Sequence, residues 1–365
     1  MLNAYGRFAV PAFTPVILNL CLIGSAFVDG GSVQVLAYAV FLAGVLQFAF
    51  QLPSLWKLRL LPRPRWGWRD GRVRRIVELM IPVLIGSSIA QVSLLINSNL
   101  STHFGDGSVS WLYYANRLME FPLGIFSIAV GTAILPTLSA QHAVAQGQQF
   151  SSTLDWGLRT ILIIGLPAAA GMLLLAGPLV TSIYGHGRFG AEDVRMTTYA
   201  LWAYGAGFMG FSLIKVLVPG FYARQETKLP VRFAIIALIV GMAFSLGVFL
   251  VDNHSPLPAA HVGLAISTTL TAWVNAGLLY RRLRRDGIYV PGSGWGGFAL
   301  RITAATLAMA AVVWFFAGPI ELWLSLDAAH RGLRLLLVIV AAMLAYFGVL
   351  IALGLRPRDL RPRRG

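Results

Sequence analysis

Long apolar runs separated by short polar breaks dominate the pattern along the chain. Ten of these runs have about the 20 residues that a helix needs to cross a hydrocarbon core of about 30 Å. Polar breaks such as LPRPRWGWRDGR at 61–72 and RRDGIYVPGSG at 284–294 separate neighbouring runs. The pattern predicts an all-α polytopic membrane protein with transmembrane helices at 8–28, 32–52, 76–101, 109–137, 154–177, 196–218, 231–251, 261–281, 298–318 and 333–355.

Composition agrees with a membrane protein and disfavours other classes. Charged residues make up 12% of the chain and apolar residues 57%, whereas a soluble domain has about 25% charged residues. Cys21 is the single cysteine, so no internal disulfide framework exists, and the six histidines show no ligand spacing. We therefore predict no metal and no cofactor. The first 13 residues lack the pattern of a cleaved signal peptide, and we expect none.

Basic residues orient the predicted helices. With the N-terminus placed in the cytoplasm, the inside segments carry 23 of the 29 Lys and Arg residues and the outside segments carry 4. This asymmetry follows the positive-inside rule and predicts that both termini are cytoplasmic. The basic residues are divided among separate loops, so the net charge of +15 reports topology and does not indicate nucleic-acid binding.

The basic segment 57–75 has two interpretations. It is either a positive-inside anchor, with Trp66 and Trp68 at the interface, or a surface that contacts anionic lipid headgroups. Both interpretations use the same residues, and the sequence leaves both open.

Arg117 and Glu120 lie inside the otherwise apolar run 111–136. A charge at membrane depth costs about 2.5 kcal/mol or more on insertion scales, so such residues usually face a partner or a wet cavity. A spacing of three places the two side chains on one helical face. Together with Lys215 they predict a cavity with excess positive charge, suited to a phosphate or pyrophosphate. The alternative is an ion pair that only fixes helix packing.

Other polar and proline positions within the runs are ambiguous. Lys215 lies about one turn from the cytoplasmic end of its run and either snorkels to the interface or faces the cavity. The polar residues between Gln91 and Asn99 are expected to bond helix to helix. Prolines allow the bends that alternating access uses, although they are common in transmembrane helices in any case; they are Pro11, Pro15, Pro82, Pro122, Pro136, Pro167 and Pro219.

No catalytic motif is present in the sequence. A GxxxxGK[ST] loop and a GxSxG elbow are both missing. We therefore predict a protein that is not an enzyme, with any energy supplied by an ion gradient or the membrane potential.

Several long motifs resemble one known family. These are SVSWLYYANRLMEFPLGIFSIAVGTAILPTLS (108–139), LVTSIYGHGRFGAEDVRMTTYAL (179–201) and PGFYARQETKLPVR (219–232), supported by 3–20 and 38–57. They resemble the MurJ (MviN) family of lipid II flippases, within the multidrug/oligosaccharidyl-lipid/polysaccharide exporter superfamily. The resemblance covers nearly the whole chain and weakens after about residue 290.

The resemblance implies a fold, a substrate and a site. Family members have two six-helix lobes around a cationic cavity and two extra C-terminal helices, and they carry undecaprenyl-linked peptidoglycan precursor to the periplasmic leaflet. The implied domains are 1–60, the end of the first lobe; 61–290, the second lobe; and 291–365, the extra helices and basic tail. The implied location is the bacterial inner membrane. The expected substrate-binding set is Arg117, Glu120, Asn116, Tyr113 and Lys215, with Arg117 meeting the pyrophosphate. Expected partners are lipid II, membrane lipids and cell-wall synthesis or division proteins, and not nucleic acid.

The chain also departs from the family pattern. The family has fourteen helices, and this sequence shows ten. The order of the predicted helices suggests that they begin at the family's fifth helix and that the first four are absent. The run 231–251 lacks the asparagine and aspartate of the sodium site described in some members, and no such site is assigned. The alternatives are an exporter of another polyprenyl-linked glycan or amphiphile, and a non-transporting scaffold or degenerate homologue.

Overall fold

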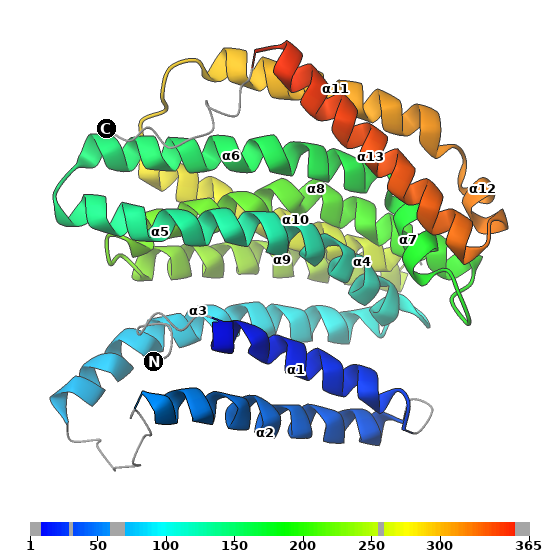
Figure 1. Cartoon of the computed structure of the whole chain (residues 1–365), viewed down its shortest axis with the longest axis horizontal. Helices are drawn as coiled ribbons and strands as arrows, with labels where there is room; N and C mark the ends of the chain where they lie inside the picture. Colours follow the sequence, from blue (N-terminus) through cyan, green and yellow to red (C-terminus); the bar gives the residue numbers. More distant parts are fainter. Residues whose placement is uncertain (1–8, 29–31, 59–69, 255–258, 355–365) are drawn as a thin grey trace. The chain divides into compact units, whose positions relative to one another are not determined.

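The computed structural model describes residues 9–28, 32–58, 70–254 and 259–354, and these form helices without a strand (Figure 1). They divide into two compact units, Met1–Arg75 and Ile76–Gly365. The elements are α1 Ala9–Ser25, α2 Val33–Lys57, α3 Gly71–Ser101, α4 Ser108–Pro122, the π-helix η2 Leu123–Ser127, α5 Ile128–Ala143, α6 Gly147–Leu174, α7 Ala176–Tyr184, α8 Ala191–Tyr222, α9 Lys228–His254, α10 Ala260–Arg285, α11 Trp295–Ala317, α12 Ile320–Ser325 and α13 Ala328–Ala352.

Each of the ten predicted runs coincides with a helix, and the prediction of an all-α membrane protein is confirmed. Eight helical segments among the described residues are long and apolar enough to cross a membrane. The 17-residue α1 is shorter, and α3 is not among the eight, so the count of ten is not confirmed. The short helices α7 and α12 were not predicted, because neither is long enough to show a hydrophobic period.

Some sequence predictions fall outside the described residues. They include most of the basic segment 57–75, the basic tail 356–365, and the side chains of Pro82 and Ser93. The predicted domain boundaries at 60 and 290 stay predictions.

The first unit contains α1 and α2, which pack against each other. Phe13 of α1 and Phe50 of α2 lie with ring centroids 5.5 Å apart, so the two helices run in opposite directions. Ala39 and Ala43 are buried one turn apart on α2, which allows close approach of the two backbones.

The second unit is organised around α8, which packs against α4, α5, α6, α7 and α10. Small residues on α8 make this possible, since a Cβ on Gly207 would overlap Thr269 of α10 and one on Gly210 would lie only 3.1 Å from the backbone of Ala272. Helices in a membrane gain little from the hydrophobic effect between them, and such close contacts supply the packing energy instead.

The predicted run 109–137 is one continuous helical path with a break in its middle. Pro122 ends α4, and the next five residues form the π-helix η2 before α5 continues. Proline removes one backbone hydrogen bond, and a single π turn accommodates the loss. Ser127 in this turn donates a buried hydrogen bond of 2.9 Å to Ser212 of α8, which fixes the break against the central helix.

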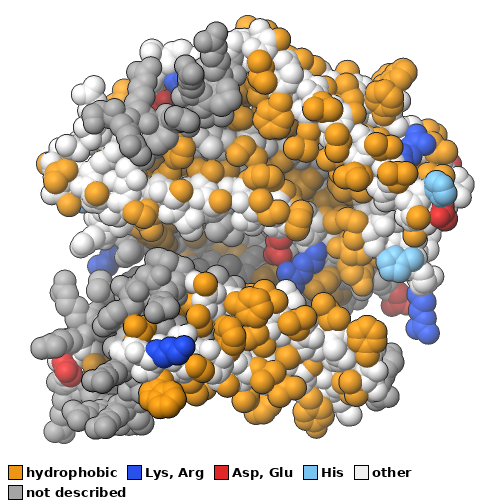
Figure 2. Space-filling view, in the orientation of Figure 1, with side chains coloured by type: hydrophobic (Ala, Val, Ile, Leu, Met, Phe, Trp, Pro, Cys, Tyr) orange, Lys and Arg blue, Asp and Glu red, His pale blue; other side chains and the backbone are white. Residues whose placement is uncertain are grey.

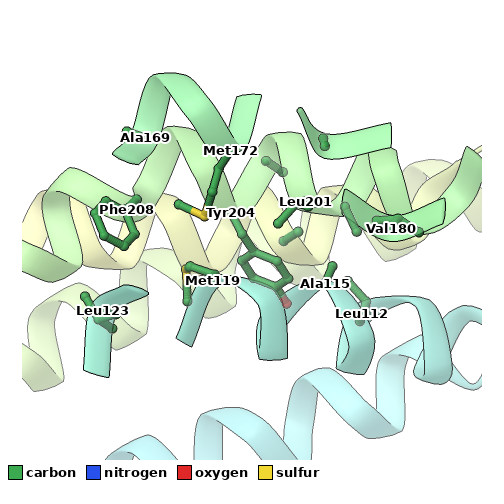
Figure 3. Close-up of a cluster of buried hydrophobic side chains, with 14 of the residues drawn as sticks. Leu112, Ala115, Met119, Leu123, Ala169, Met172, Val180, Leu201, Tyr204 and Phe208 are labelled. Carbon is green, nitrogen blue, oxygen red and sulfur yellow. The ribbon is translucent and has the colours of Figure 1, made fainter. Parts of the chain in front are cut away.

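One core cluster lies between α4, α6, α7 and α8 (Figure 3). Leu112, Ala115 and Met119 supply the buried face of α4. The ring of Tyr204 reaches from α8 toward α4 between Met119 and Ala115. This packing leaves the opposite face of α4 exposed within the unit.

The helices α11 and α13 pack against each other, and α11 packs along α6. Their shared core includes Ile302, Met309 and Val338, and the Tyr346 hydroxyl donates a 2.6 Å bond to the Ile163 carbonyl of α6. The C-terminal pair is therefore fastened to α6 along its length.

A buried carboxylate ties the start of α11 to α6. Asp155 accepts hydrogen bonds from the Tyr289 hydroxyl at 2.8 Å, Trp295 Nε1 at 2.7 Å and the Gly292 amide at 3.1 Å. It also pairs with Arg159 at 2.8 Å. Arg159 in turn donates to the Ser293 carbonyl at 2.8 Å. We call this group the Asp155 clasp.

Two arginines fasten the other end of the C-terminal pair. Arg331 donates to the Gly185 carbonyl at 2.7 Å and to the Leu324 carbonyl at 2.9 Å. Arg334 donates to the Phe316 carbonyl at 3.1 Å and lies over the Trp323 ring. Backbone carbonyls at helix ends lack helical partners, and these guanidinium groups satisfy several of them.

Hydrophobic side chains cover much of the visible surface of each unit (Figure 2). Among them are Leu300, Leu307, Trp314 and Leu344 on α11 and α13, each more than 60% exposed. Exposed apolar area on this scale is expected where lipid is the solvent, and not in a monomeric soluble protein.

Replacing Gly131 by alanine is expected to destabilise the second unit. A Cβ there would overlap the carbonyl oxygen of Lys215, so α5 and α8 would have to separate, at a cost of about 1–3 kcal/mol. Thermal unfolding in detergent measures the change. Gly171→Ala is the matched control: nothing lies within 4 Å of the added Cβ, and stability should shift by less than about 1 kcal/mol. Equal effects of the two substitutions would contradict the close contact.

Asp155→Asn is expected to lower the free energy of unfolding by about 1.5–3 kcal/mol, because the half-buried Arg159 loses its counter-charge and Tyr289 and Trp295 lose a charged acceptor. The control is Glu192→Gln, which removes the carboxylate of an exposed i,i+3 pair with Arg195 and should cost less than about 1 kcal/mol. Equilibrium unfolding of both variants compares them, and a loss for Asp155→Asn no larger than the control would show that the clasp contributes little.

Candidate functional site

Four of the five predicted site residues form one hydrogen-bonded group on α4. Arg117 Nη1 donates to Glu120 Oε2 at 3.0 Å, and Arg117 Nε donates to the Tyr113 hydroxyl at 3.2 Å. The Asn116 amide donates to Glu120 Oε1 at 2.9 Å. The guanidinium also lies 5.2 Å from the centre of the Tyr113 ring. We call these residues the Arg117 group.

The helix itself brings the Arg117 group together. Residues three or four positions apart are neighbours on a helix surface. The three hydrogen bonds have this spacing, since they join Tyr113 to Arg117, Asn116 to Glu120 and Arg117 to Glu120. The buried residues Leu112, Ala115 and Met119 occupy the other side of α4. The polar group therefore does not depend on any other helix for its internal contacts.

The Arg117 group is accessible. The side chains of Arg117 and Glu120 are 57% and 47% exposed. Two of the five guanidinium N–H groups are used in the bonds above, and the hydroxyl of Tyr113, which accepts from Arg117, keeps its own proton to donate. The arrangement can present several donors to an anion while Glu120 holds the guanidinium in place.

The fifth predicted residue, Lys215, lies elsewhere on the same unit. The carbonyl oxygen of Lys215 lies next to Gly131 of α5, and Gly131 follows Arg117 by 14 positions. At a rise of 1.5 Å per residue, Arg117 and Gly131 are about 20 Å apart along the helix axis. Lys215 is exposed and does not join the Arg117 group. The Arg117–Glu120 pair is therefore formally neutral by itself, without the excess positive charge that the sequence predicted for a cavity lined by all three.

The polar run on α3 bonds to neighbouring helices at Asn97, in agreement with the prediction. Asn97 Nδ2 donates to Thr268 Oγ1 of α10 at 3.3 Å, and Asn97 Oδ1 lies 3.3 Å from the Ser245 hydroxyl of α9. Ser245 donates its single proton to Ser267 at 2.7 Å, because Ser267 donates its own to the Gly241 carbonyl. The three helices share one polar junction in this unit.

Asp155 has a role that was not predicted from the sequence. The predicted run begins at 154, but α6 begins at Gly147, so Asp155 lies two turns inside the helix and is buried. Its partners Tyr289, Gly292 and Trp295 lie more than 130 positions away, and only the tertiary structure joins them. Burial, and then the bond to Asp155, raise the pKa of Tyr289 above its ordinary value, so this hydroxyl stays a donor. The spacing of Asp155 and Arg159 was the available signal.

In residues 9–28, 32–58, 70–254 and 259–354, no three His, Cys, Asp or Glu side chains come close enough together to hold a metal ion.

Comparison with known proteins identifies the family. The model of the family described as lipid II flippase MurJ matches residues 1–328. A probable lipid II flippase MurJ from Haemophilus influenzae is 40% identical over 370 residues, which cover 99% of this chain and 71% of that protein. A lipid II flippase MurJ from Burkholderia cenocepacia is 38% identical over 376 residues, covering 100% of this chain and 71% of that protein.

A solved structure shares the fold. Lipid II flippase MurJ in an inward closed conformation superposes with a TM-score of 0.70 at 22% identity, over 96% of this chain and 70% of that one. With the matched family model and relatives of this similarity, the chain belongs to the lipid II flippase MurJ family.

Proposed function

We propose that this protein moves lipid II, the undecaprenyl-pyrophosphate-linked peptidoglycan precursor, from the cytoplasmic to the periplasmic leaflet. The observation that carries the proposal is the Arg117 group: an accessible guanidinium, held by Tyr113 and Glu120 from the adjoining turns of the same helix, within a helical segment apolar enough to cross a membrane. Membership of the flippase family supports the choice of substrate.

Arg117 would bind the pyrophosphate. A guanidinium offers parallel N–H groups that match two phosphate oxygens, and such charge-assisted bonds are about twice as strong as neutral ones. Glu120 and Tyr113 limit the rotamers of Arg117, which lowers the entropy lost on binding. Because the Arg117–Glu120 pair is neutral overall, the anion would be held without a large excess of positive charge, so it can also be released.

The headgroup would cross by alternating access, while the polyprenyl tail stays in lipid. Lys215, about 20 Å along the axis from Arg117, would contact the headgroup at a different stage from Arg117, or snorkel to the interface. The π turn after Pro122, between the positions of Arg117 and Lys215, is a place where the helix can bend.

The family is one of transporters rather than catalysts, and we propose that this chain has no catalytic activity of its own. The protein is a multi-pass membrane protein, and the distribution of Lys and Arg supports an orientation with both termini in the cytoplasm. Association with cell-wall synthesis or division proteins stays a prediction.

Arg117→Ala is expected to weaken lipid II binding by about 10–100-fold, the loss typical of a charge-assisted pair. Arg117→Lys should recover only part of the affinity, because an ammonium lacks the planar fork. The measurement is binding of lipid II to the purified chain in nanodiscs. Arg195→Ala is the control, since Arg195 has the same exposure and also pairs with a glutamate three positions away. Equal affinity of Arg117→Ala and the wild type would remove Arg117 from the site.

Expression of the chain in cells depleted of their own lipid II flippase tests transport. We expect growth to be rescued by the wild type and by Arg195→Ala, and not by Arg117→Ala at equal membrane abundance. Loss of folding in Arg117→Ala would instead support an ion pair that only fixes packing. Binding of another polyprenyl-linked glycan in preference to lipid II would favour the alternative exporter, and good expression without binding or rescue would favour a scaffold.

A further inference from the structure

A pocket of about 390 Å³ opens where α4, α7 and α8 meet the loop 185–190. Both aromatic and charged side chains line it, among them Trp111, Tyr114, Tyr184, His186, Arg188 and Phe189. Arg188 and His186 are exposed, and the four aromatic residues are half-buried. The function proposed above does not use this pocket.

Three aromatic rings form one wall of the pocket. Tyr114 lies with its ring centroid 4.6 Å from that of Tyr184 and 5.5 Å from that of Phe189. Tyr184 and Phe189 are 6.0 Å apart. The rings come from α4, from the end of α7 and from the loop, so they hold these three segments together as well as lining the cavity.

Trp111 is fixed in the pocket by its surroundings. Its Nε1 donates to Asp193 Oδ1 at 2.8 Å, and Asp193 Oδ2 accepts from the Gly190 amide at 2.9 Å. Gly107 has a φ of +94°, and a Cβ there would come within 2.6 Å of the Trp111 ring. The pocket wall is therefore built before any ligand arrives.

The loop is held from the C-terminal helices. Arg331 of α13 donates to the carbonyl of Gly185 at 2.7 Å. Gly185 is the first residue of the loop that carries His186 and Arg188. This bond fixes one end of the loop that carries the two exposed basic side chains.

The pocket adjoins the Arg117 group along α4. Ser110, Tyr114 and Arg117 follow one another at intervals of four and three positions, so they share one helical face. Tyr114 lies about 4.5 Å from Arg117 along the axis, and Ser110 about 10 Å. The Tyr113 ring, which holds Arg117, contacts the Tyr114 ring at a centroid distance of 5.7 Å. A ligand bound to Arg117 that extends by one to two turns along α4 would reach the pocket.

Aromatic walls with a few polar groups suit a sugar ring. The C–H face of a pyranose is apolar and weakly positive, and it packs on the negative face of an aromatic ring, while Arg188 and His186 can meet anionic substituents. In a lipid-linked glycan the first sugar is bonded directly to the pyrophosphate. We propose that this pocket binds the saccharide part of the substrate headgroup while Arg117 holds the pyrophosphate, an inference that rests on the function proposed above.

Comparing two ligands tests the proposal: lipid II, and undecaprenyl pyrophosphate, which has the same tail and pyrophosphate but no sugar. Binding of each to the purified full chain in nanodiscs would be measured for the wild type, Tyr184→Leu, Arg188→Ala and Arg117→Ala. Tyr222→Leu and Arg195→Ala are the controls, because these two residues lie on α8 outside the pocket and are exposed.

We expect Tyr184→Leu to weaken lipid II binding by about tenfold, the loss of one good aromatic contact. Binding of undecaprenyl pyrophosphate should change by less than about twofold, within the scatter of near-neutral substitutions. Arg188→Ala, which removes an exposed side chain and does not threaten folding, should show the same selectivity. Arg117→Ala should weaken both ligands.

Three results would overturn the subsite. Equal losses for both ligands in the pocket variants would show that the pocket binds the pyrophosphate or acts only on folding. Unchanged lipid II binding in the pocket variants, with Arg117→Ala still impaired, would remove the subsite and keep the proposed function. No lipid II binding by the wild type would overturn the proposed function itself.

Discussion

The guanidinium of Arg117 imposes the constraint from which the rest of this site follows. A charge at membrane depth must find its partners within the protein or in a wet cavity. Here Tyr113 and Glu120 supply them from the same helix, and Asn116 donates to Glu120 in turn. Because the group is complete on α4, its geometry does not change when other helices move. In the alternating access proposed above, the donors of this group would therefore stay arranged throughout the cycle.

The other face of α4 meets an equally strict requirement. Leu112, Ala115 and Met119 pack against α8, where Tyr204 fills the space between them (Figure 3). Close contact here and at the glycines of α8 supplies the van der Waals energy that holds helices together in lipid. The π turn after Pro122 is fixed to the same helix by Ser127 and Ser212. The central helix α8 thus positions both α4, which carries the Arg117 group, and the π turn that follows α4.

The C-terminal helices are fastened by polar bonds at both ends, not by apolar packing alone. The Asp155 clasp holds the start of α11. Arg331 and Arg334, near the start of α13, donate to the carbonyls of Gly185 and Phe316. A hydrogen bond lost in an apolar environment is costly, so these bonds hold the pair against α6 and the end of α7. Arg331 also fixes the loop that lines the aromatic pocket, which links the C-terminal pair to the proposed saccharide site.

The sequence by itself determined the class, the helical segments and the Arg117 group. A hydrophobic run of about 20 residues has one solution in a bilayer, and contacts three or four positions apart follow from helix geometry alone. Only the tertiary structure decided that Lys215 lies far from Arg117, and that Asp155 meets Tyr289 and Trp295. It also brought Tyr114, Tyr184 and Phe189 into one wall. These relations join residues on different helices, and their distances depend on how the helices pack, which the spacing of residues along the chain does not encode.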